Sequence, residues 1–225
     1  MASKFGFLSK LNFLQNIASK LISGINPAIV HNIEKYLTLK KVHYLSAVEG
    51  LDGDYLEFGV YTGSSFCHSI RCIKSLKKIQ PSIMKTNFFG FDSFEGFGDL
   101  SAEDTHPFYI GENFDTDFDT DFDTVNKRVK KVSGQIKYKL VKGFFSESLK
   151  YGAEFYSIKK IKILFIDSDT YSSSIEAFKF SIPAIQEGSY IVLDDFFSYK
   201  GSAEKGIAKA FKCSGLTNLD TKIAL

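Results

Sequence analysis

The spacing of apolar side chains divides the chain, from residue 54 onward, into alternating strand-like and helix-like segments. Short β-rich apolar runs are typical of buried strands, and apolar residues at every third or fourth position are typical of helices. The predicted strands are 54–60, 87–92, 136–141, 162–167 and 190–194, and the predicted helices among them are 64–79, 172–185 and 202–213. This alternation predicts an open, doubly wound α/β domain whose mostly parallel sheet is covered by helices on both faces.

The first 50 residues follow a different pattern, which predicts two helices and no strand. In the first of them, apolar residues recur at helical spacing at Phe7, Leu11, Leu14, Ala18 and Leu21, and a second periodic stretch covers 27–48. We therefore expect an N-terminal helical cap at 1–50 and a second domain at 51–225. A membrane-surface helix is an alternative, but the polar face is only weakly basic. Packing on its own domain or on a partner subunit is the simpler expectation, and it would support a homo-oligomer.

Five aspartates at two-residue spacing interrupt the middle of the chain, in FDTDFDTDFDT at 114–124. A calcium loop that began at Asp115 would need glycine and glutamate where the chain has Thr120 and Asn126. One apolar helical stripe instead runs through Phe114, Phe118, Phe122, Val125, Val129 and Val132. The repeat is therefore interpreted as the solvated surface of a helix, with acids in its N-terminal half and bases in its C-terminal half, as the helix dipole favours. A lone strand with one acidic face is the alternative.

Composition excludes several classes of protein. The chain has 225 residues, 44% of them apolar, and a net charge of +2 with acids and bases interspersed, so no footprint for nucleic acid or anionic lipid is visible. No run approaches the roughly 18 apolar residues of a membrane span. Cys67, Cys72 and Cys213 form no C-x-x-C pair, which indicates neither a disulfide framework nor a zinc site, and the default compartment is a reducing cytoplasm.

The first predicted strand ends in a glycine-containing turn, EFGVYTGSS at 57–65. Gly59 and Gly63 would let the backbone approach a ligand before a helix starts at Ser64, although the dinucleotide fingerprint G-x-G-x-x-G is not met. Glu57 would suit an amino group better than a pyrophosphate. Asp92 ends the second strand, where such folds hold ribose hydroxyls. Together these features favour a nucleoside-bearing ligand without phosphates.

Four further aspartates end two other predicted strands, in LFIDSDTY and IVLDDFF. Because neighbouring parallel strands lie about 4.8 Å apart, several carboxylates could converge at one point, where a divalent cation would relieve their repulsion. Oxygen ligands select Mg²⁺, Ca²⁺ or Mn²⁺. The alternative is that these acids cap the helices that follow, but two acids on each strand are more than capping needs. The four are Asp167, Asp169, Asp194 and Asp195.

Five motifs in this order resemble the macrocin O-methyltransferase type of S-adenosylmethionine (AdoMet)-dependent enzymes, which have the class I methyltransferase fold. They are GDYLEFGVYTGSS, FFGFDSFEG, LVKGFF, LFIDSDTYSSSIEA and GSYIVLDDF, and the resemblance extends from about residue 53 to residue 211. It implies Mg²⁺-dependent transfer of a methyl group from AdoMet to a hydroxyl of a sugar or glycosylated small molecule. Residues 51–225 would then be the methyltransferase domain.

The resemblance also implies roles for individual residues. Glu57, Gly59 and Gly63, with Ser64 at the helix start, would hold the methionine part of AdoMet, and Asp92 with Ser93 would hold the ribose. Asp167, Asp194 and Asp195 would bind Mg²⁺. Asp169 would be the general base that takes the proton from the acceptor hydroxyl.

Two departures from the family pattern leave alternatives open. Relatives usually have a basic residue where this chain has Thr62, and the antiparallel hairpin that normally closes the fold is expected to be missing after the last helix. An inactive relative that binds AdoMet without turnover is therefore one alternative. A catechol-type enzyme is another, although Thr170 and Asp195 replace the lysine and asparagine of that type.

Overall fold

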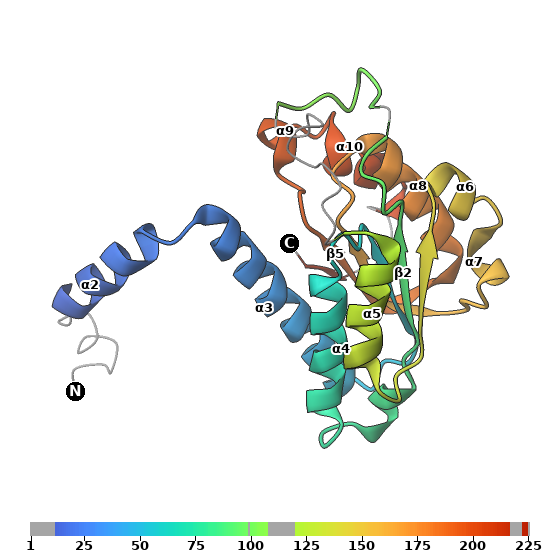
Figure 1. Cartoon of the computed structure of the whole chain (residues 1–225), viewed down its shortest axis with the longest axis horizontal. Coiled ribbons are helices and arrows are strands. Elements are labelled where there is room, and N and C mark those ends of the chain that lie inside the picture. Colours follow the sequence, from blue (N-terminus) through green and yellow to red (C-terminus); the bar gives the residue numbers. More distant parts are fainter. Residues whose placement is uncertain (1–11, 99, 108–119, 217–221, 225) are drawn as a thin grey trace. The chain divides into compact units, whose positions relative to one another are not determined.

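In the computed structural model, which describes residues 12–98, 100–107, 120–216 and 222–224, six parallel strands form one sheet in the order β3-β2-β1-β4-β5-β6 (Figure 1). The strands are β1 (Asp54–Phe58), β2 (Phe88–Asp92), β3 (Tyr138–Lys142), β4 (Ile161–Ile166), β5 (Ile185–Leu193) and β6 (Lys222–Ala224). The first five correspond to the predicted strands. The doubly wound α/β fold is thereby confirmed.

Two apolar layers cover the two faces of this sheet. Successive side chains of a strand point to opposite faces. Tyr55 therefore packs in the layer that contains α4 (Ser64–Leu76) and α5 (Phe122–Ser133), and Leu56 packs in the layer that contains α8 (Tyr171–Ser181) and α10 (Gly206–Cys213). Buried Cys67 belongs to the first layer, as expected for a small apolar side chain.

Shorter helical segments complete the connections between strands. They are η1 (Pro81–Lys85), α6 (Phe145–Ser148), α7 (Gly152–Phe155), η3 (Ile182–Ala184) and α9 (Ser198–Gly201). In α9, Tyr199 and Lys200 have left-handed backbone angles instead of helical ones. The segment is therefore a strained turn directly after β5.

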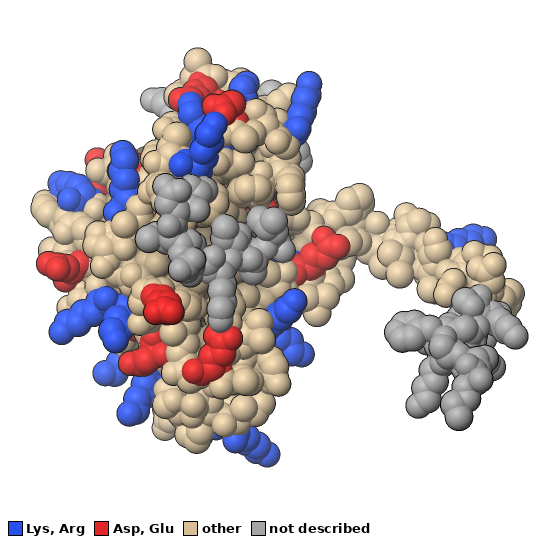
Figure 2. Space-filling view, turned by 180° about the vertical axis from the view of Figure 1, so that it is seen from behind, with Lys and Arg blue, Asp and Glu red and all other residues tan. Residues whose placement is uncertain are grey.

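Two helices at the start of the described chain match the expected N-terminal pair: α2 (Asn12–Ser23) and α3 (Pro27–Val48). The chain divides into two compact units, Met1–Lys35 and Tyr36–Leu225, so the division falls inside α3. Helix α2 buries none of its residues and is almost uncharged on the side that Figure 2 shows. The assignment of 1–50 as a cap stays a prediction. Among the described residues, no helix is both long and apolar enough to cross a membrane.

The aspartate repeat leads into a helix, as its stripe of apolar residues predicts. Asp121 is the N-cap of α5, because its Oδ1 accepts hydrogen bonds from the amides of Asp123 (3.0 Å) and Thr124 (3.1 Å). The alternative of a lone strand is wrong for Phe122–Ser133. The preceding part of the repeat, at 114–119, lies outside the described residues. On the face seen in Figure 2, acidic and basic side chains are interspersed.

The end of the sheet differs from the expectation. After α10, residues 222–224 form β6, which pairs with β5 in parallel, with Tyr190 opposite Lys222 and Val192 opposite Ala224. The apolar pattern did not predict this strand, since three residues are too few to show a periodicity. In the described part of the chain, β5 thus has a sixth strand beside it and no antiparallel hairpin.

Candidate active site

The register of the sheet brings two of the predicted acids together. Ile166 of β4 is paired with Leu193 of β5, so the next residues along both strands, Asp167 and Asp194, emerge side by side. The ladder continues for one more step, because the amide of Asp194 donates to the carbonyl of Ile166 (3.1 Å). Parallel pairing therefore positions these acids without any local motif.

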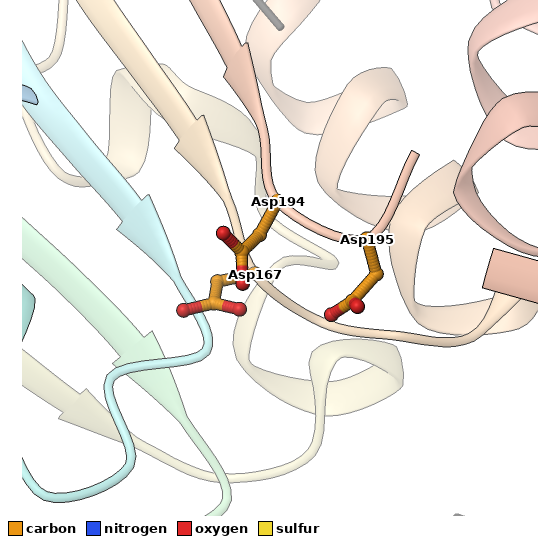
Figure 3. A group of neighbouring side chains, drawn as sticks. All are labelled: Asp167, Asp194 and Asp195. Carbon is orange, nitrogen blue, oxygen red and sulfur yellow. The ribbon is translucent and has the colours of Figure 1, made fainter. Parts of the chain in front are cut away.

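A third carboxylate completes the group. Asp167, Asp194 and Asp195 are half-buried, and each offers an oxygen such that the three lie within 4.8 Å of one another (Figure 3). Ligand oxygens on opposite sides of one ion lie about 4.2 Å apart around Mg²⁺ and about 5 Å apart around Ca²⁺. Separations of at most 4.8 Å are compatible with three oxygens that share one such ion. The sequence-predicted trio is brought together as expected.

Asp169 joins the same group, but not in the predicted way. The strand ends at Ile166, and Asp169 adopts a left-handed backbone angle (φ 59°), so it does not continue the alternation that would align it with Asp167. Its carboxyl is instead hydrogen-bonded to that of Asp195. We call Asp167, Asp169, Asp194 and Asp195 the aspartate cluster.

The charge state of Asp169 follows from its surroundings. Burial raises the pKa of its carboxyl well above the ordinary value, and the hydrogen bond with Asp195 and the charges of Asp195, Asp167 and Asp194 raise it further. The carboxyl of Asp169 is therefore harder to ionise than that of an ordinary aspartate. A divalent cation would act in the opposite direction, because a nearby positive charge lowers the pKa of a carboxyl.

Helix capping does not explain the acids after β4. The N-cap of α8 is Thr170, whose hydroxyl accepts from the amide of Ser173 (3.3 Å). Asp104, which is distant in sequence, accepts hydrogen bonds from the other amides of the first turn. Its Oδ1 accepts from the amides of Tyr171 (2.8 Å) and Ser172 (3.3 Å). The first turn of α8 is thus satisfied without Asp167 or Asp169, which removes the capping alternative for these two residues.

The turn after β1 begins the other half of the site. Gly59 has φ +91°, and a Cβ there would lie 1.9 Å from the carbonyl oxygen of Asp167. The glycine is therefore required by the close approach of the residue after β4, which the sequence alone did not indicate. Gly63 is the N-cap of α4 and has no side chain to cap it, and Ser64 is the exposed first residue of that helix.

Glu57 lies beneath this turn and is fully buried. One of its oxygens accepts a hydrogen bond from the hydroxyl of Tyr55, and the other accepts one from Ser65 (2.6 Å). Glu57 therefore joins β1 to α4.

Asp92 and Ser93, at the end of β2, are committed to local turns. The two oxygens of Asp92 accept from the amides of Tyr61 (2.8 Å) and Phe94 (2.7 Å), which joins the turn after β1 to the turn after β2. Burial raises the pKa of the Asp92 carboxyl, while these hydrogen bonds lower it. Ser93 donates to the carbonyl of Gly96 (2.6 Å). Both residues shape the edge where a ribose was predicted to bind.

Arg128 brings a cation to this turn from a distant helix. Its guanidinium, on α5, donates a hydrogen bond to the carbonyl of Thr62 (3.1 Å), the position at which the sequence lacks the basic residue usual in relatives. No pattern in the sequence marked Arg128, because it stands among other basic residues of an amphipathic helix. Only packing of α5 against α4 reveals the contact.

Comparison with known proteins identifies a family by sequence and similar structures by fold. The profile of the Macrocin-O-methyltransferase (TylF) family matches residues 34–218. The solved structure of the calicheamicin methyltransferase CalS11 is similar in fold (TM-score 0.64, 17% identity, over 95% of this chain and 85% of that chain). So is the O-methyltransferase NovP (TM-score 0.63, 15% identity, over 84% of this chain and 73% of that chain).

A third similar structure is an O-methyltransferase from Bacillus cereus in complex with SAH (TM-score 0.50, 14% identity, over 89% of this chain and 74% of that chain). No curated protein sequence matches the chain. The family match covers most of the 225 residues, including the turn after β1 and the aspartate cluster. The chain therefore belongs to the macrocin-O-methyltransferase (TylF) family and is an O-methyltransferase.

Proposed function

We propose that this enzyme transfers a methyl group from AdoMet to a hydroxyl of a sugar or glycosylated small molecule, with Mg²⁺ at the aspartate cluster. The observation that carries the proposal is the convergence of Asp167, Asp194 and Asp195 within 4.8 Å, with Asp169 hydrogen-bonded beside them. The sugar acceptor is supported by CalS11, which is described as a TDP-rhamnose 3'-O-methyltransferase, and AdoMet by the SAH complex of the Bacillus cereus enzyme.

Asp167, Asp194 and Asp195 are the proposed metal ligands. Their oxygen-only donor set suits a hard divalent cation, which would relieve the repulsion between the three carboxylates. When bound, Mg²⁺ would lower the pKa of a coordinated hydroxyl and orient it toward the methyl donor.

Asp169 is the proposed general base. A sugar hydroxyl is hardly acidic, so its oxygen needs to lose the proton as it forms the new bond to carbon. AdoMet supplies the methyl group and leaves as S-adenosylhomocysteine. The carboxylate of Asp169 would receive the proton, because it lies beside the proposed metal ligands and therefore beside the hydroxyl that a bound cation would orient.

The turn after β1 is the proposed site of the methionine part of AdoMet. Helix α4 begins at Ser64, after Gly63, whose amide donates to the carbonyl of Val60 (2.8 Å), and the positive end of that helix dipole suits a carboxylate. Arg128 adds a full positive charge beside Thr62. Glu57 would accept the ammonium group, and Asp92 with Ser93 would border the ribose, in addition to the hydrogen bonds that these residues make within the protein.

We further propose a homo-oligomer formed through the N-terminal helices. On α2, large apolar side chains are exposed at Phe13, Leu14, Ile17, Leu21 and Ile22. Sedimentation of the full chain at several concentrations tests the oligomer.

The proposed compartment is the cytoplasm. Free cysteines at Cys67, Cys72 and Cys213 suit a reducing compartment.

A methyl-transfer assay with labelled AdoMet tests the proposed function. The assay uses a panel of glycosides, nucleotide sugars and catechols, with MgCl₂ in one arm and EDTA in the other. We expect transfer to at least one sugar hydroxyl that EDTA abolishes. Transfer that persists in EDTA would overturn the metal role, and transfer only to catechols would favour the catechol-type alternative. Calorimetric AdoMet binding without any transfer would indicate an inactive relative.

A further inference from the structure

A long-range contact joins two loops at the carboxyl edge of the sheet, one after β2 and one after β5. The hydroxyl of Tyr199 donates a hydrogen bond to the main-chain carbonyl of Asp104 (2.9 Å). Both residues are buried, at 7% and 1% exposed. The contact spans 95 positions of sequence, so no local pattern could indicate it.

The segment 101–107 is anchored from several sides. Asp104 holds the first turn of α8 through Oδ1, and its Oδ2 accepts a hydrogen bond from Ser101 (2.7 Å). Glu103 forms an ion pair with Lys209 of α10. The ring of His106 meets the ring of Tyr199 edge to face, with centroids 4.8 Å apart.

Tyr199 also lies beside the aspartate cluster. Besides burial, the nearby negative charges of Asp104, Asp169 and Asp195 raise the pKa of its phenol. A Cβ at Gly206 would lie 2.6 Å from the Tyr199 ring and 3.7 Å from the carbonyl oxygen of Asp169. Glycine at 206 therefore leaves the space that the ring occupies.

The backbone at Tyr199 is held in an unfavourable conformation. Tyr199 and Lys200 have φ values of 57° and 61°, which non-glycine residues adopt at a free-energy cost. Among the described residues, left-handed non-glycine residues also follow β1, β2 and β4, at Tyr61, Phe94 and Asp169. Five of the six such residues in the described chain thus follow the ends of strands, and the sixth, Ser157, precedes β4.

We propose that Tyr199 is a positioning residue for the acceptor, because its hydrogen bond to Asp104 holds the 101–107 segment, with His106, beside the aspartate cluster. This inference rests on the proposed function, since it assigns the acceptor side of the same site. The methyl donor would bind at the turn after β1, and its affinity should not depend on the contact.

Hydrogen exchange of the full chain tests the contact without any ligand. In Tyr199→Phe, amides of 101–107 should exchange about three- to tenfold faster than in the wild type, as expected for loss of one hydrogen bond. Tyr156→Phe is the matched control, because the Tyr156 hydroxyl also donates to a main-chain carbonyl, that of Ser148 (2.5 Å). It should leave exchange at 101–107 unchanged.

A second pair of variants changes the contact between the Asp104 side chain and the first amides of α8. Asp104→Ala removes the acceptor for the α8 amides and should accelerate exchange at 101–107 as Tyr199→Phe does. Asp104→Asn keeps both an oxygen acceptor and the main-chain carbonyl, so it should stay within about threefold of the wild type. Unchanged exchange in both Tyr199→Phe and Asp104→Ala would overturn the contact.

Steady-state kinetics test the acceptor role, with the glycoside that the wild type methylates fastest. Tyr199→Phe should raise the acceptor KM about three- to tenfold, with kcat and the AdoMet KM within about twofold of the wild type. An unchanged acceptor KM, or an equal rise in Tyr156→Phe, would overturn the role. If the wild type methylates no glycoside, the acceptor role fails with the proposed function, and the exchange comparison still decides whether Tyr199 holds the segment.

Discussion

The two edges of the sheet differ in the signs of the charged side chains that lie close together there. At the amino edge, where the strands begin, both signs are present: Lys162 donates to the Thr86 hydroxyl (2.5 Å), and Asp54 accepts from the side chain of Asn87 (2.8 Å). Burial lowers the pKa of Lys162 to about 8, against the raising influence of Asp52 and Asp54. Oppositely charged side chains of the chain itself thus share this edge.

At the carboxyl edge, the residues that follow β4 and β5 bring acidic side chains close together. The charges that act on Asp169 are those of three other aspartates, and all of them raise its pKa. An arrangement of like charges costs stability, and the proposed cation would compensate that cost. Under the proposed function, the amino edge contributes to the stability of the fold and the carboxyl edge contributes the catalytic acids.

The sharpest way to break this comparison is to neutralise the proposed base. Asp169→Asn should lower kcat by about 10²- to 10⁴-fold, because the acceptor proton loses its carboxylate, while AdoMet affinity stays the same. The measurement is methyl transfer together with AdoMet calorimetry. Asp123→Asn, at an exposed aspartate of α5, is the matched control and should retain activity. Turnover that survives in Asp169→Asn would show that another group takes the proton.

Metal binding should appear as a large stabilisation of the carboxyl edge. At a hundredfold excess over Kd, Mg²⁺ would stabilise the wild type by about 2.7 kcal/mol, a rise in Tm of several degrees. Asp194→Asn should raise the Tm of the EDTA-treated protein, since it removes one of the crowded charges, and should respond little to MgCl₂ or CaCl₂. Scanning calorimetry decides this, and an equal metal response in the variant and the wild type would remove Asp194 as a ligand.

The amino edge should respond to pH through His43, which stacks on Tyr55 in the core. Burial first, and the charge of Lys162 second, lower the pKa of His43 to about 3, from 6.5. The unfolded chain therefore binds a proton between these values that the folded chain does not. Stability present above pH 6.5 is lost as the pH falls, by about 2 kcal/mol down to pH 5.

His43→Leu tests this assignment. Among the described residues, neither ring nitrogen of His43 has a hydrogen-bond partner, so an apolar replacement should cost little at pH 7. Denaturant unfolding at pH 7 and pH 5 should show a smaller acid-dependent loss in the variant than in the wild type. An equal loss in both would place the acid sensitivity elsewhere.

The smallest expected effect concerns Arg128, which contacts the turn after β1. Arg128→Gln should weaken AdoMet binding about three- to tenfold, because the charge beside Thr62 is lost while a shorter donor remains. Kcat at saturating AdoMet should change less. Lys130→Gln, at an exposed position of the same helix, is the control. Equal AdoMet affinity in Arg128→Gln and the wild type would exclude this contact from the cofactor site.

Much of the fold follows from local patterns. Helix α3 has the predicted bounds, Pro27–Val48, and the five predicted strands all form, because long periodic helices and continuous apolar strands are strong signals. The prediction that Asp167 and Asp194 meet needed only the rule that parallel strands end at one edge. The orientation of Asp169 was not predictable in this way, because the chain leaves the strand before it and turns through a left-handed residue.

The sequence by itself determined the alternation of strands and helices, the family, and the placement of acids at the ends of β4 and β5. Tertiary structure decided three contacts between distant parts of the chain. They are the hydrogen bond between Asp169 and Asp195, the hydrogen bond from Arg128 to Thr62, and the hydrogen bond from Tyr199 to Asp104. The physical reason is separation along the chain. Local periodicity specifies which face of an element is apolar, whereas contacts between side chains tens of residues apart exist only once the elements have packed.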